Sequence, residues 1–145
     1  PMLEQAFQDV YTKFKLHFYQ NVFQRFATRE ATLTTVESFC MEGIMAMGEP
    51  TIAEFSRMMQ ISTPNAAYKI GSLVKKGYTE RERSEKDRRI VYIHLTGKGR
   101  QAFHHHAKFH EQMTDAVMAE LGEEEVQVLG KTLKALTDFF RSYKK

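Results

Sequence analysis

The sequence lacks the features that mark secreted and membrane-spanning proteins. Its 145 residues contain a single cysteine, so the chain cannot form a disulfide framework of its own. It has no apolar run long enough to span a bilayer and no signal-peptide pattern. We therefore expect a soluble, cytoplasmic protein that has no membrane partner.

The motifs of the common enzyme classes are absent as well. There is no glycine-rich phosphate loop, no His-Glu-x-x-His zinc motif and no Gly-x-Ser-x-Gly nucleophile elbow. The single cysteine, Cys40, has no obvious histidine and asparagine partners for nucleophilic catalysis. We expect a protein that is not an enzyme and that requires no cofactor.

What the chain does have is positive charge concentrated in one segment. Residues 63–100 hold ten Lys or Arg against four Asp or Glu, a balance of +6. Because the whole chain carries a net charge of +3, the remaining residues together carry −3. A basic cluster of this kind attracts nucleic-acid phosphates through the release of condensed counterions.

Residues 51–100 have the pattern of two helices followed by a basic hairpin. The order is TIAEFSRMM, a turn through QIST, then PNAAYKIGSLVKKG, GYTERERS, EKDRR and IVYIHLT. Two helices joined by a short turn allow the second to lie in a major groove of DNA. A basic hairpin directly after it would reach phosphates or the adjacent minor groove. The pattern predicts a winged helix-turn-helix.

Local chemistry predicts where these helices begin. Thr51 and Glu54 form a capping box, in which the hydroxyl and the carboxylate each accept a hydrogen bond from a free backbone amide. Thr34 and Glu37 repeat this pattern upstream. The second helix of the motif is expected to begin with Thr63 as its cap.

The second helix of the motif has one apolar and one polar face. The residues expected to be buried are Ala67, Ile70, Leu73 and Val74. The polar face and the hairpin carry the residues predicted to contact DNA. These are Ser62, Thr63, Asn65, Tyr68, Lys69, Ser72, Lys75 and Lys76 on the helix, and Arg81, Lys86, Asp87, Arg88 and Arg89 on the hairpin.

Three stretches make the chain resemble the MarR-type transcriptional regulators. They are LVKKGYTERERS, the Asp87-Arg88-Arg89 sequence that fits the family's Asp-x-Arg wing pattern, and IVYIHLTGKGR. The resemblance implies a homodimer on double-stranded DNA whose recognition helices occupy successive major grooves, with Arg89 in the minor groove and Asp87 orienting it. Within the family, RSEKDRRIVYIHLTGKGR and HHHAKFHEQM look most like the fatty-acid-synthesis repressors of Gram-positive bacteria, which respond to long-chain acyl groups on acyl carrier protein.

The rest of the chain is expected to be helical. Apolar residues mark one face of a first helix at Leu3, Phe7, Val10, Phe14 and Phe18, and of a last helix at Val126, Leu129, Leu133, Leu136, Phe140 and Tyr143. Another helix is expected from Thr96 onward. A small winged domain cannot cover all of these faces, so we expect them to pack across a two-fold axis.

The predicted fold is therefore mainly α with a small β-hairpin wing, and with long N- and C-terminal dimerisation helices. We expect a single MarR-type domain over residues 1–145. Residues 33–100 would form its winged helix-turn-helix DNA-binding lobe. Residues 1–32 and 101–145 would form its helical dimerisation lobe.

Methionine is the first candidate for ligand binding. Five of the eight methionines lie between residues 41 and 59, and their unbranched, polarizable side chains make an adaptable apolar lining. One hypothesis is a pocket for an acyl-group effector, formed by Phe14, Phe18, Met41, Met45, Met58 and Met59. The alternative is that these methionines are the core of the small domain.

Histidine is the second candidate. Four histidines lie close together in the sequence, at His104, His105, His106 and His110. His106 and His110 share a helix face and, with Glu37, would form a Zn²⁺ site like that of zinc-sensing MarR-type relatives. Ser38 departs from the histidine expected in those sensors. The alternative is that these are ordinary half-buried or subunit-interface histidines.

Together these patterns predict a sequence-specific DNA-binding transcriptional regulator. We expect a repressor that occupies a palindromic operator as a homodimer and controls fatty-acid synthesis genes in response to acyl carrier protein. One alternative is a zinc-responsive repressor of the same family. Another is a helical adaptor whose wing binds an acidic protein, and this adaptor would show no preference among DNA sequences.

Overall fold

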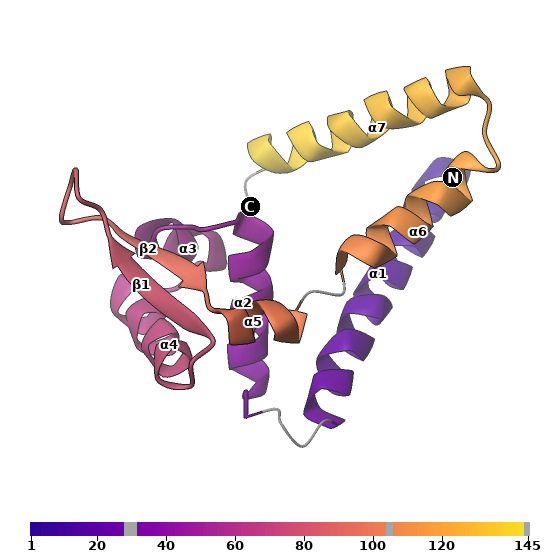
Figure 1. The fold of residues 1–145 in the computed structure, drawn as a ribbon. Helices are drawn as coiled ribbons and strands as arrows, with labels where there is room; N and C mark the ends of the chain where they lie inside the picture. The colour runs from indigo at the N-terminus through magenta and orange to yellow at the C-terminus, as the bar shows by residue number, and fades with distance from the viewer. Residues whose placement is uncertain (28–31, 104–105, 144–145) are drawn as a thin grey trace. The chain divides into compact units, whose positions relative to one another are not determined.

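The computed structural model describes residues 1–27, 32–103 and 106–143 (Figure 1). In chain order the elements are α1 (Met2–Ala27), α2 (Thr35–Met47), α3 (Ile52–Met59), α4 (Thr63–Lys75), β1 (Thr79–Arg83), β2 (Val91–Leu95), α5 (Gly97–Phe103), α6 (His106–Met118) and α7 (Glu123–Ser142). The described residues form a mainly helical fold with one two-stranded antiparallel hairpin. This confirms the predicted fold class.

The chain forms two compact units, Pro1–Phe103 and His104–Lys145. The first unit holds the apolar core, to which α2, α3, α4 and the hairpin all contribute. Its buried members are Leu33, Cys40, Met41, Ile44, Phe55, Ala66, Ile70, Leu73, Tyr78 and Ile93. In the described part of the chain, no helix has the length and apolarity needed to cross a membrane. The predicted lobe boundaries stay a prediction.

Both predicted capping boxes are confirmed. At the start of α2, the Thr34 hydroxyl accepts from the Glu37 amide at 3.2 Å, and Glu37 Oε1 accepts from the Thr34 amide at 2.9 Å. Thr51 and Glu54 make the same reciprocal pair at the start of α3. Each pair satisfies two backbone amides that the first turn of a helix leaves free, which fixes where the helix begins.

The cap of α4 differs from the prediction by one residue. Ser62 has an extended backbone, and its hydroxyl accepts from the Asn65 amide at 3.2 Å. Thr63 is therefore the first residue of the helix and not its cap, because Ser62 offers the same hydroxyl chemistry one position earlier.

The buried face of α4 also differs from the prediction at its start. Ala66, Ile70 and Leu73 are fully buried, whereas Ala67 is only partly so. The first inward position is Ala66, because it lies about one full turn before Ile70. Ile70 and Leu73 follow it at spacings of four and three, which keeps the apolar stripe on one side of the helix.

The hairpin of β1 and β2 follows α4 (Figure 1), and contacts with the turn before α3 anchor it. Its strands pair from Thr79 with Leu95 to Arg83 with Val91. Ile93 is fully buried, and its amide donates to the Pro50 carbonyl at 2.8 Å, beside a single β-bridge between Thr51 and Tyr92. The turn before α3 thus pairs with β2 at one position, which ties the wing to the helix-turn-helix.

The region after the wing is helical in its described residues, as predicted from Thr96 onward. It comprises α5 and α6, and residues 104–105 between them lie outside the described part of the chain. The predicted last helix is confirmed as α7, with Glu123, Glu124 and Glu125 in its first turn. Acidic residues there are favourable because they lie near the positive end of the helix dipole.

Candidate nucleic-acid interface

The first turns of α4 point predicted contact residues into solvent. Ser62, Thr63 and Asn65 are exposed, and Tyr68 is 79% exposed. The N-terminal turns of a recognition helix are the part that reaches base edges in a major groove. Tyr68 is the largest side chain available for such a contact, because a phenol offers both an apolar ring and a hydroxyl.

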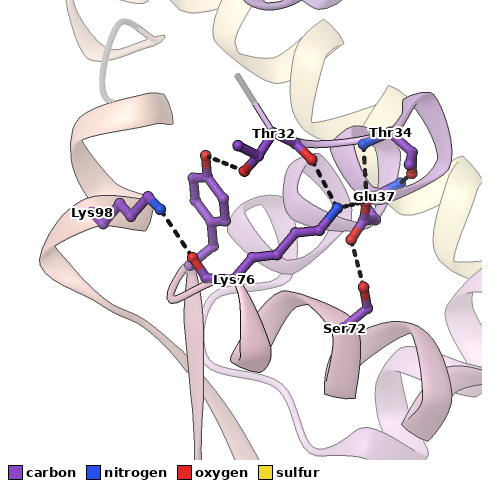
Figure 2. A network of polar contacts seen from close by, with 7 residues as sticks. Thr32, Thr34, Glu37, Ser72, Lys76 and Lys98 are labelled. Carbon is purple, nitrogen blue, oxygen red and sulfur yellow. Dashed lines mark hydrogen bonds and ion pairs between the residues drawn. The ribbon is translucent and has the colours of Figure 1, made fainter. Parts of the chain in front are cut away.

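The polar residues at the end of α4 differ in whether they are exposed. Lys75 is exposed, but Ser72 and Lys76 are bonded to Glu37 of α2 (Figure 2). The Ser72 hydroxyl donates to Glu37 Oε2 at 2.8 Å, and Lys76 Nζ donates to Glu37 Oε1 at 2.7 Å. Two of the residues predicted to contact DNA are thus engaged inside the unit, while Lys69 is partly buried and Lys75 stays free to face a partner.

Glu37 is the buried charge at the centre of these contacts. Glu37 is only 6% exposed. Burial alone would raise the pKa of Glu37, but hydrogen bonds from Lys76, the Thr34 backbone and hydroxyl, and Ser72 together lower it to about 2. Glu37 is therefore ionised at neutral pH.

Arg81 on β1 reaches back across the recognition helix. Its Nη2 atom donates to the Ala67 carbonyl at 3.2 Å. A Cβ atom placed on Gly71 would lie 3.1 Å from the same Nη2 atom, so the absence of a side chain at Gly71 leaves room for the guanidinium. Arg81, predicted as a DNA contact, therefore also holds the wing against α4.

The wing tip holds one arginine in a fixed orientation. Arg89 Nε and Nη2 donate to the two carboxylate oxygens of Asp87, each at 3.0 Å, and the Arg89 amide donates to Asp87 Oδ1 at 3.1 Å. The Arg89 side chain is nevertheless 90% exposed. The paired guanidinium lowers the pKa of Asp87, so this carboxylate stays ionised. Lys86 and Arg88 beside them are exposed.

Sequence reasoning missed a histidine at the base of the wing. His94 Nδ1 lies 2.9 Å from Glu49 Oε1, and Nε2 contacts a carboxylate oxygen of Glu82. Glu49 precedes α3, while Glu82 and His94 lie on paired strands. The IVYIHLT stretch placed His94 in the predicted hairpin, but the sequence contained no signal for its partners in another element.

We expect His94 to make the stability of the fold depend on pH. The Glu49 hydrogen bond raises the pKa of His94 above its ordinary 6.5, against the effect of burial, and Glu82 adds to the rise. Its contribution should be complete below pH 6.5 and should be lost as pH rises through the raised pKa. The free energy of unfolding of His94→Gln should thus fall furthest below wild type in acid and approach it in alkali. A difference independent of pH in urea unfolding would contradict this role.

The residues proposed for an effector pocket differ in how far they are buried. Met41 is fully buried in the core, and Met45 and Met59 pack against that core. Met58 is 62% exposed, and Phe14 is also exposed. Phe18 stacks on Phe39 with ring centroids 5.7 Å apart. Met41 therefore packs in the core of the first unit. The effector pocket stays a prediction.

The residues of the alternative zinc site belong to different units of the chain. Glu37 lies in the first unit and is bonded to Lys76 and Ser72. His110 lies on α6 in the second unit. The side chain of His106, like His104 and His105, falls outside the described residues. The described side chains include no cluster of three or more metal-ligating residues, and the zinc site stays untested.

Comparison with known families identifies the chain's relatives. A family model described as transcriptional regulator SarA/Rot matches residues 23–106, more than half of the chain. The chain belongs to the SarA/Rot family of transcriptional regulators. The match includes α2 to α5 and both strands, and so covers α4 and the hairpin, which carry the predicted contacts.

Solved structures confirm the MarR-type winged-helix fold of this SarA/Rot family member. FabT of Streptococcus pneumoniae, solved in complex with DNA, is 30% identical, with a TM-score of 0.66 over 97% of this chain and 99% of FabT. A MarR family protein from Bacillus stearothermophilus is 17% identical, with a TM-score of 0.67 over 97% of this chain and 94% of its own. The second likeness is one of fold alone.

A further relative shares the central part of the sequence. BilQ, an HTH-type transcriptional regulator of Clostridium symbiosum, is 41% identical over 78 residues. These residues make up 48% of this chain and 54% of BilQ, so the match spans about half the length of that relative.

Proposed function

We propose that this regulator is a repressor that binds a palindromic operator in double-stranded DNA as a homodimer. The observation that carries the proposal is the pairing of an exposed recognition helix with an oriented wing arginine. Tyr68 is 79% exposed in the first turns of α4, and Arg89 is 90% exposed while Asp87 holds it. A helix for the major groove and an arginine for the minor groove together read a duplex. The DNA-bound state of FabT supports the proposal.

A second copy of the chain is the partner we propose for α1 and α7. Leu3 and Phe23 on α1 are 70% and 74% exposed, and Phe140 on α7 is 69% exposed. Apolar surface of this kind marks an interaction site, because water contact with it is unfavourable. Pairing of two copies through these helices would present two recognition helices to half-sites about one helical turn of DNA apart.

Selection of bound duplexes from a random pool tests this function. The expected result is enrichment of a palindrome, and native mass spectrometry of the complex should give two chains per duplex. Binding that depends on charge but enriches no sequence would contradict the proposal that the protein is a sequence-specific regulator. That result would favour the helical adaptor that binds an acidic protein.

The two ends of α4 are expected to differ in their effect on sequence preference. Asn65→Ala or Tyr68→Ala should change which bases are selected, because each good base contact contributes roughly 1 to 3 kcal/mol of discrimination. Lys75→Ala should weaken binding to all sequences by a similar factor, because a phosphate contact carries no base information. Repeating the selection with each variant measures this. A new preference in Lys75→Ala alone would show that α4 lies in the groove the other way round.

The effector that we propose is a long-chain acyl group carried on acyl carrier protein, which would place the protein in the control of fatty-acid synthesis. The likeness to FabT over nearly the whole chain supports the control of fatty-acid synthesis, and the sequence resemblance alone suggests the carrier protein. A coupling of about 1 to 3 kcal/mol between the effector and DNA would change DNA affinity by roughly 5- to 150-fold. The selected duplex should be titrated with acylated carrier protein and, separately, with Zn²⁺ against a chelator. A response to zinc alone that disappears in His110→Ala would favour the zinc-responsive alternative.

A further inference from the structure

A network of polar contacts joins the chain before α2 to the last turn of the recognition helix (Figure 2). Lys76 Nζ donates to Glu37 Oε1 at 2.7 Å and to the Thr32 carbonyl at 2.8 Å. Ser72, one turn earlier on α4, donates to the other oxygen of the same carboxylate at 2.8 Å. One buried acid thus grips α4 at two successive turns.

A second lysine, which follows α4 in the chain, also contacts the end of this helix. Lys98 Nζ donates to the Lys76 carbonyl at 3.0 Å and lies 4.5 Å from the centre of the Tyr78 ring. The Lys76 carbonyl is one that the helix leaves free at its end, where a cation is favourable. The main chain and the side chain of Lys76 are therefore both engaged within the first unit.

Lys75 and Lys76 are neighbours in sequence but differ in what they can contact. Lys75 is exposed, whereas the side chain of Lys76 is 30% exposed and its ammonium has two partners. If Lys76 turned away from this site toward a phosphate, Glu37 would remain buried without its cation. Breaking a buried ion pair in this way is strongly unfavourable, since one charge is left uncompensated.

We propose that Glu37 is a positioning residue for the recognition helix, which it holds through Ser72 and Lys76, and that Lys76 serves this clamp in place of a DNA phosphate. The inference rests on the proposed function, in which α4 enters a major groove. Base contacts depend on the angle at which α4 enters the groove, but attraction to phosphates depends on total charge. Loosening the clamp therefore lowers operator affinity and leaves charge-driven binding intact.

The test compares four variants on two DNA probes over a series of salt concentrations. The probes are the palindromic duplex selected from the random pool and a scrambled duplex of equal length. Glu37→Gln removes the charge partner of Lys76 but preserves the capping box, because glutamine can take the place of glutamate in it. Lys76→Met removes the other half of the clamp. Lys75→Met and Glu80→Gln are the charge-matched controls at exposed positions of α4 and β1.

The clamp predicts a distinct pattern for each pair of variants. Glu37→Gln and Lys76→Met should each weaken binding to the palindrome about tenfold, with a salt slope close to that of wild type. Their affinity for the scrambled duplex should change by less than about twofold. Lys75→Met should instead weaken binding to both probes and make the salt dependence of binding less steep, as the loss of a phosphate contact does. Glu80→Gln should leave the discrimination between the probes unchanged.

Coupling between the two clamp residues gives a second readout. The double variant Glu37→Gln/Lys76→Met should bind the palindrome no more weakly than Lys76→Met alone, because both remove one interaction. Thermal unfolding of each variant, measured without DNA, shows whether a fold has been lost. Additive losses in the double variant would overturn the clamp.

Failure of the inference is distinguishable from failure of the proposed function. If Lys76→Met reduces the salt slope as much as Lys75→Met does, Lys76 is a phosphate contact and the clamp is wrong. If the wild-type protein itself fails to discriminate between the two probes, the proposed function is wrong and the positioning role falls with it.

Discussion

Arg89→Ala is expected to weaken operator binding about 30-fold, which corresponds to a loss of about 2 kcal/mol, without unfolding the protein. The reason is that Arg89 is an exposed charge that is already oriented. Its guanidinium makes two 3.0 Å hydrogen bonds to Asp87, so little side-chain freedom remains to be lost when it enters a minor groove. Fluorescence anisotropy with the selected duplex measures the change.

Arg88→Ala is the matched control for this prediction. Arg88 is an exposed arginine in the same loop, whereas Asp87 holds the side chain of Arg89. Replacement of Arg88 should cost a few-fold in affinity through charge alone. Equal losses in the two variants would show that orientation by Asp87 has no role. Normal binding by Arg89→Ala would show that the wing has been assigned wrongly.

Gly99→Ala is expected to lower the free energy of unfolding by about 3 kcal/mol or more, because the backbone comes too close for any side chain. A Cβ atom at Gly99 would lie 2.2 Å from the Tyr78 carbonyl oxygen, a backbone atom. The same region is held by the Thr96 amide, which donates to that carbonyl at 3.1 Å. The first turn of α5 or the start of β1 would have to move. Thermal or urea unfolding measures the loss.

The same helix supplies a control for the Gly99 prediction. A Cβ atom at Gly97 would meet nothing within 4 Å. Gly97→Ala should therefore be neutral or stabilising by a few tenths of a kcal/mol, because alanine reduces the freedom of the unfolded chain. If both substitutions destabilise equally, the cause is the loss of glycine in α5 and not the contact with Tyr78.

Features set by residues close together in sequence could be predicted. The capping boxes at Thr34 and Thr51 depend on a partner three positions away, and the hold of Asp87 on Arg89 depends on one two positions away. The order of the helices and the hairpin follows from hydrophobic period and turn chemistry, which are also local. The one-residue error at Ser62 arose because two adjacent hydroxyl residues can each cap a helix.

The contacts that could not be predicted join residues far apart in sequence. Lys76 and Glu37 are 39 positions apart, and sequence alone gives an exposed lysine on a polar face no reason to turn inward. His94 meets Glu82 because of the strand register and Glu49 because the turn before α3 packs against the wing. Such partners depend on how elements pack, and packing is not encoded in a local pattern.

The salt dependence of binding to the selected duplex is the most direct measurement of the central claim. Because a basic recognition helix and wing from each of two subunits would contact phosphates, the logarithm of the association constant should fall with the logarithm of salt concentration at a slope of roughly −5 to −10. The palindrome should remain favoured over the scrambled duplex throughout the series. A flat salt response, or equal affinity for the two duplexes, would contradict the account of this chain as a sequence-specific DNA-binding regulator.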